Sequence, residues 1–82
     1  MSKNNVYSLK SFVIKNDTPV LDGYLLFPNE EKGDTFLKMA NLSNNYWGPK
    51  SYYEKNEFVQ VNDFIFQKVN ENKSFFVRSL KD

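Results

Sequence analysis

Aromatic and basic side chains are interleaved in one stretch of the chain, Asn44 to Phe58. This stretch holds the only Trp and three of the five Tyr, and Gly48 and Pro49 interrupt any regular helical or strand pattern. Aromatic rings beside lysines stack on nucleic-acid bases and contact phosphates, while Trp and Tyr are also frequent anchors of protein interfaces. The alternative is a lid, with the rings folded back over the core. We predict a long loop with five candidate binding residues: Tyr46, Trp47, Lys50, Tyr52 and Tyr53.

The residues that most enzymes use for catalysis are scarce. The chain has no His and no Cys, and so lacks an imidazole base, a thiolate nucleophile and an ordinary zinc site. Glu30 and Glu31 are adjacent, but they lie in a predicted polar loop, where they are better explained as solubilising groups. The three glycines are too far apart to form a phosphate-binding loop. We predict a protein that is not an enzyme and that uses no metal or other cofactor.

The length of the chain, 82 residues, indicates one domain. We place this domain at residues 6–82 and predict that the polar segment 1–5 is disordered. Without Cys or His the domain has neither disulfides nor a zinc site to stabilise it. Its core must therefore come mainly from the aromatic side chains, which make up 17% of the residues.

Charge and hydropathy limit the kinds of partner. The longest apolar run, Tyr24 to Phe27, is far shorter than the ~20 residues that cross a bilayer. The formal net charge is only +1, so the chain as a whole has no field that would attract nucleic acid or an anionic membrane. The lack of Cys and of a secretory segment leads us to expect a cytoplasmic protein without a membrane partner.

The first half of the chain predicts a hairpin followed by a helix. Two runs rich in β-branched and aromatic residues, Val6 to Lys15 and Val20 to Phe27, flank a polar turn. Gly23 within the second run indicates a bulge or a close approach of other groups to the backbone. An apolar stripe at helical spacing then predicts a short helix from Asp34, its expected cap, to Leu42, where Asn41, Asn44 and Asn45 would end it.

The second half of the chain predicts a meander of strands. Alternating apolar residues indicate strands at Glu57 to Val61, Phe64 to Val69 and Ser74 to Leu80. The four polar residues from Asn70 to Lys73 would form the hairpin turn between the last two.

The segment from Val59 to Phe66 resembles the short turn by which SH3-like barrels pass from one strand to the next. Asn62 occupies the position of the usual glycine, and Asn tolerates a positive φ better than other residues with a side chain. This resemblance implies a barrel-like architecture and no particular function.

Together these patterns predict an α+β domain. It would be a small, strongly twisted antiparallel sheet or a partly open SH3-like barrel, with about five strands and one short helix. The expected function is non-catalytic binding of a protein partner, as an inhibitor, adaptor or regulator of a larger assembly. The alternative is binding of single-stranded nucleic acid by aromatic stacking and Lys or Arg contacts. Self-association through an open sheet edge is a further expectation.

Overall fold

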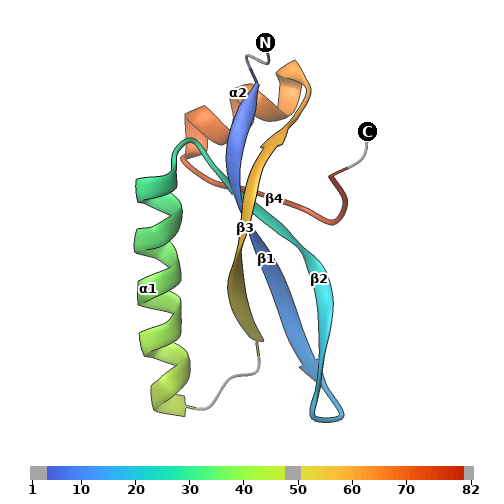
Figure 1. The fold of residues 1–82 in the computed structure, drawn as a ribbon, viewed down its shortest axis with the longest axis vertical. Coiled ribbons are helices and arrows are strands. Elements are labelled where there is room, and N and C mark those ends of the chain that lie inside the picture. Colours follow the sequence, from blue (N-terminus) through green and yellow to red (C-terminus); the bar gives the residue numbers. More distant parts are fainter. Residues whose placement is uncertain (1–3, 48–50, 81–82) are drawn as a thin grey trace.

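The computed structural model describes residues 4–47 and 51–80 and, within these ranges, all side chains except those of residues 41, 43–47 and 51. The described strands form one antiparallel sheet of four strands in the order β3-β1-β2-β4 (Figure 1). This confirms the predicted α+β class and, of the two architectures, the open sheet. In chain order the elements are β1 (Asn5–Lys15), β2 (Thr18–Phe27), α1 (Glu30–Trp47), β3 (Ser51–Gln60), α2 (Asp63–Asn72) and β4 (Phe75–Val77).

The predicted hairpin is confirmed, with a tighter turn than expected. Asn16 and Asp17 both have positive φ, 53° and 63°, the conformation of the two central residues of a type I′ turn. Asn and Asp adopt it more readily than other residues with a side chain. β2 therefore begins at Thr18 and includes Pro19, which had been expected in the loop.

The predicted irregularity at Gly23 is also confirmed. The β1/β2 register shifts between Ser11 and Phe12, because Ser11 pairs with Gly23 whereas Phe12 pairs with Leu21. A Cβ on Gly23 would lie 2.5 Å from the Val77 carbonyl oxygen and against the Phe76 ring. Only a residue without a side chain fits there.

The helix α1 is much longer than predicted. Asn29, rather than Asp34, caps it, because the Asn29 side-chain oxygen accepts a 3.0 Å hydrogen bond from the Lys32 backbone N–H. Glu30 and Glu31 consequently lie in the first turn, at the positive end of the helix dipole, instead of in a loop. The helix continues past the asparagines that were expected to end it and reaches Trp47.

The predicted strand from Phe64 to Val69 is wrong, since these residues belong to α2. The Asn62 side chain caps this helix by accepting a 2.9 Å hydrogen bond from the Ile65 N–H. The predicted turn at Asn70 to Lys73 is wrong for the same reason: the helix runs to Asn72 and ends at Lys73, whose φ is 67°. The likeness of Val59 to Phe66 to a barrel turn therefore does not extend to the structure.

The sheet lies between two helical layers. On one face, which we call the α1 face, Tyr7, Leu9 and Phe27 are buried against side chains of α1 that include Phe36 and Leu37. On the opposite α2 face, four buried side chains form the second part of the core together with Ile65 and Phe66 of α2 and Phe75, Val77 and Leu80 near the C-terminus. These four are Val6, Leu26, Val61 and Val69. Neither α1 nor α2 as described is long and apolar enough to span a membrane.

Candidate functional site

The predicted aromatic loop is mostly regular structure. Tyr46 and Trp47 form the end of α1, so their backbone is helical, and their side chains are outside the description. Lys50 lies outside the described residues. β3 begins at Ser51, six residues earlier than the predicted strand. The loop expected at Asn44 to Phe58 is therefore a helix end and a strand, joined through residues 48–50.

The neighbouring residues Tyr52 and Tyr53 point to opposite faces of the sheet. The Tyr53 ring meets the Phe36 ring of α1 edge-on, with centroids 5.0 Å apart, and belongs to the α1-face core. The Tyr52 ring stacks on Phe12 of β1, with centroids 5.0 Å apart and an interplanar angle of 16°. The structure thus separates these two candidates: Tyr53 packs beneath α1, and Tyr52 lies on the α2 face.

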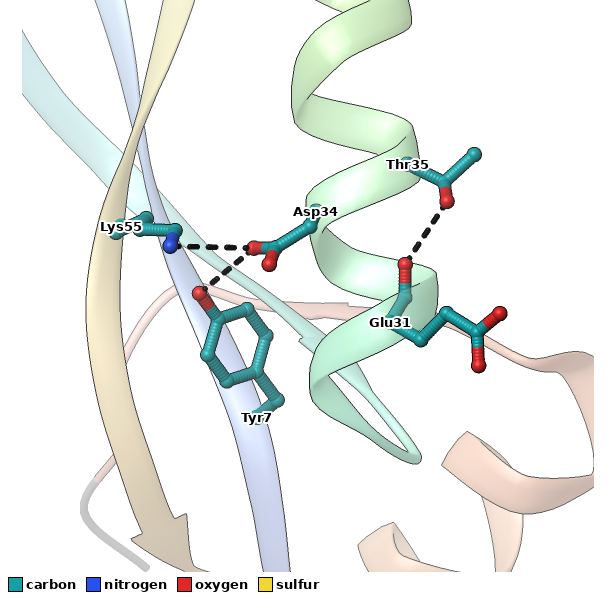
Figure 2. Close-up of polar contacts among 5 residues, drawn as sticks. All are labelled: Tyr7, Glu31, Asp34, Thr35 and Lys55. Atoms are coloured by element: carbon teal, nitrogen blue, oxygen red, sulfur yellow. Dashed lines mark hydrogen bonds and ion pairs between the residues drawn. The ribbon is translucent and has the colours of Figure 1, made fainter.

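A polar cluster ties the start of α1 to the sheet (Figure 2). The Tyr7 hydroxyl donates a 3.0 Å hydrogen bond to the Asp34 carboxylate, and the Lys55 ammonium lies 3.6 Å from the same carboxylate oxygen. Burial, followed by the hydrogen bond and negative charge of Asp34, raises the pKa of Tyr7 to about 12. At neutral pH this tyrosine is a protonated hydrogen-bond donor. The cluster joins α1, β1 and β3 and offers no free base or nucleophile.

A different surface becomes visible when the α2 face is followed toward the hairpin turn. Phe12 of β1 pairs with Leu21 of β2 on one side and with Tyr52 of β3 on the other, in the row that follows Lys10 and Tyr24. Paired residues point to the same face of a sheet, so the side chains of Tyr52, Phe12 and Leu21 form one row across three adjacent strands. Ile14 and Pro19 are paired on the same face in the next row. We call this set the hairpin face: Phe12, Ile14, Pro19, Leu21 and Tyr52.

The hairpin face is not part of the described core. α2 lies at the end of the sheet away from the hairpin turn (Figure 1), and its side chains pack on residues such as Val6 and Leu26. On the hairpin face Leu21 is 44% exposed, Pro19 is exposed, and the Phe12 and Tyr52 rings are half-buried. An apolar row thus remains open to solvent beyond the limit of the α2-face core.

Charged residues border the hairpin face in pairs of opposite sign. Glu54 of β3 lies directly opposite Lys10 of β1, between the apolar row and the α2-face core. At the other side of the sheet, Arg78 donates a 2.8 Å hydrogen bond to the carboxylate of Asp22. The border therefore has no excess of either charge.

The clefts of the described surface are a weaker candidate. One of about 440 Å³ lies where the start of α1 meets the end of α2, with Phe27, Lys32 and Lys73 in its lining. Its size suits a small ligand, but Phe27 is the only apolar residue of that lining, whereas ligand pockets are usually mostly apolar. No group of three metal-ligating side chains was found among residues 4–47 and 51–80.

Sequence reasoning did not single out Phe12, Ile14 or Leu21, which were read as ordinary strand residues. The sequence carried no signal for them, because α2 was predicted as a strand. In the structure the lengths of the elements explain the open row, since an eleven-residue strand such as β1 is about 36 Å long at ~3.3 Å per residue. The ten-residue helix α2 is only about 15 Å long at 1.5 Å per residue. A helix of that length covers less than half of the strand, but its position could not be read from the sequence.

Comparisons with known proteins give no relatives: no protein-family model matches the chain, and no curated protein and no solved structure is significantly similar to it.

Proposed function

We propose that the protein is a non-catalytic binding module that attaches to a protein partner through the hairpin face. The observation that carries this proposal is the apolar row Tyr52, Phe12 and Leu21, which lies on the solvent side of the sheet with Leu21 44% exposed. Covering apolar surface contributes about 25 cal/mol per Å², so a partner that covers this row gains directly from it. Such a module could serve as an adaptor, inhibitor or regulator of a larger assembly.

The stacked pair Phe12 and Tyr52 suits the role of an interface anchor. Tyrosine is enriched among the residues that dominate binding energy, and hot-spot residues lie near the centre of an interface. Because the two rings already stack in the free protein, part of their side-chain entropy is lost before binding. Tyr52 is thus the candidate from the sequence that best fits this proposal.

Nucleic acid is the second candidate, favoured by the same stacked rings on an open sheet face next to Lys10. The charges argue against it. Arg78 is ion-paired with Asp22, and Glu54 lies opposite Lys10 in the strand register, so a phosphate backbone would meet a carboxylate beside each of these cations. A mobility-shift assay with single-stranded oligonucleotides at low and at moderate salt tests this candidate. Salt-sensitive binding that depends on Tyr52 would replace the protein-partner proposal.

Two adjacent residues offer a matched pair of variants for the main proposal. Leu21 is on the hairpin face, whereas Val20 pairs with Val13 on the α1 face and is similarly exposed, 40% against 44%. Leu21→Lys and Val20→Lys add the same charge one residue apart on opposite sides of the sheet.

The cysteine-free chain is compatible with the cytosol, where we propose that the protein binds its partner.

The test uses the tagged wild-type chain and both variants as bait in a cytosolic extract. Proteins retained by the wild type and by Val20→Lys should be lost with Leu21→Lys, while the circular dichroism spectra of all three remain the same. Equal retention by all three baits, or equal loss with both variants, would contradict a role for the hairpin face.

A further inference from the structure

The small core is the first reason to look for a specific partner of the hairpin face. Domains of about 80 residues rarely gain more than a few kcal/mol from one core, and those without disulfides or metals often gain stability by oligomerising. This chain has 82 residues and no Cys. In the described part, its buried apolar side chains are Val6, Tyr7, Leu9, Leu26, Phe27, Val61 and Val69. Covering a further apolar row would be a substantial addition.

The shape of the molecule allows two hairpin faces to meet. The described chain is elongated, 40 × 23 × 19 Å, with the hairpin turn at one end and α2 at the other (Figure 1). A second copy can be placed by a 180° rotation about an axis that lies between the two sheets, parallel to them and perpendicular to the strands. The two hairpin faces then face each other, and the hairpins run in opposite directions. When this axis passes between the two rows, the Phe12 row of each copy lies over the Ile14 and Pro19 row of the other. The two α2 helices are at opposite ends, where they do not collide.

Charge complementarity also favours a second copy. In this arrangement, Lys10 of each copy lies toward the hairpin turn of the other, where Asp17 supplies a carboxylate. Asp22 and Arg78 form an ion pair, Glu54 lies opposite Lys10 in the β1/β3 register with no ion pair between their side chains in the described part of the chain, and the whole chain carries only +1. Two such faces do not repel each other, whereas a strongly charged partner would find no complement.

The β3 edge of the sheet is a poorer route to self-association. β3 is the outermost strand on its side, but a register shift opposite Ser8 places a bulge in it. Its residues Glu54, Lys55 and Glu57 add charges along the same edge. Bulges and charged side chains are the devices by which proteins protect sheet edges from pairing.

From these observations we infer that the partner of the hairpin face is a second copy of this chain, packed face to face with the hairpins antiparallel. This inference rests on the proposed function, because it names the occupant of the same surface. The dimer is symmetric, so each substitution acts twice in it.

Sedimentation velocity over a wide range of protein concentration tests the inference. The wild type and Val20→Lys should form dimers with similar dissociation constants. Leu21→Lys should raise the dissociation constant at least about tenfold, because each copy would bury an unpaired ammonium in the interface. A wild type that stays monomeric at the highest concentration would overturn the inference, as would equal weakening by the two variants.

A double-mutant cycle tests the arrangement. Lys10→Gln and Asp17→Asn should each weaken dimerisation, and the double variant should lose less than the sum of the two. Within one chain, Lys10 and Lys15 are five positions apart along extended β1, about 16 Å at ~3.3 Å per residue, and Asp17 lies beyond Lys15 in the turn, too far from Lys10 to interact directly. Additive effects would exclude the antiparallel packing.

The outcomes separate the inference from the proposed function. A monomeric wild type whose bait still retains a protein through Leu21 would leave the proposed function standing and replace the second copy by that protein. A dimer that is insensitive to Leu21→Lys but disrupted by Glu54→Pro in β3 would show that the sheet edge, rather than the hairpin face, mediates association.

Discussion

The Tyr7 hydroxyl of β1 donates a 3.0 Å hydrogen bond to the Asp34 carboxylate of α1, across 27 residues of sequence. Directly before Asp34, Gly33 leaves no room for a side chain, because a Cβ there would lie inside van der Waals contact of the same Tyr7 ring. The first turns of α1 are thus seated on one tyrosine. This contact fixes where the start of the helix lies on the α1 face of the sheet.

Tyr7→Phe should lower the free energy of unfolding by about 1 to 2 kcal/mol, the usual net contribution of a hydrogen bond to a partly exposed charged group. Urea denaturation measures the change. Tyr24→Phe is the matched control, because Tyr24 packs against the α2-face core and no hydrogen bond of its hydroxyl was found among the described residues. Equal effects of the two variants would mean that the bond to Asp34 contributes nothing specific.

Alkaline pH should destabilise the wild type through the same tyrosine. Its pKa is raised from the ordinary 10.0 to about 12, so between these values the unfolded chain loses the Tyr7 proton while the folded chain retains it. The stabilising contribution is therefore complete below pH 10 and is lost as the pH rises through 12. Unfolding free energies of the wild type and Tyr7→Phe should converge over this interval, and parallel curves would be inconsistent with the raised pKa.

Gly33→Ala should destabilise the fold by about 1 to 3 kcal/mol, as overpacking does, although Ala normally stabilises a helix relative to Gly. The added Cβ would lie 2.6 Å from Cε2 of the Tyr7 ring, which its hydrogen bond and burial hold in place. Thr35→Ala, on the exposed side of the same helix, should change stability by less than about 0.5 kcal/mol. A thermal melt that shows Gly33→Ala to be the more stable variant would refute this close contact.

Asn62→Ala should cost about 1 kcal/mol and loosen the first turn of α2, because its side chain accepts from the Ile65 N–H. Asn62→Asp should retain the cap and lose little. Hydrogen exchange at the amides of residues 64–66 reports on the change. If α2 were instead the strand expected from the sequence, the two variants would behave alike at these amides.

The strand-to-helix error at Phe64 to Val69 has a physical reason. Short apolar runs fit both periods: Phe64 and Phe66 alternate as in a strand, while Ile65 and Val69 have helical spacing. The deciding feature was the cap, Asn62, whose oxygen satisfies a first-turn N–H. That residue had been assigned to a barrel turn, and local chemistry alone did not distinguish the two roles.

The first hairpin was predictable because its signals agree. Two β-rich runs flank Asn16 and Asp17, and the register confirms their pairing. The candidate site was predictable only in part. Tyr52 and Tyr53 are adjacent aromatic residues in the sequence, and only the pairing of β3 with β1 places one beneath α1 and the other beside Phe12.

The most direct test of the hairpin face as the surface that binds a second copy is a two-dimensional NMR titration in which the unlabelled chain is added to the isotopically labelled chain. We predict that the amide signals which shift belong to the residues around Phe12, Leu21 and Tyr52, and that the same signals stay in place when Leu21→Lys is added instead. Shifts confined to the exposed residues Met39 and Leu42 of α1, or to the β3 edge away from Tyr52, would contradict the assignment of the hairpin face as the interface.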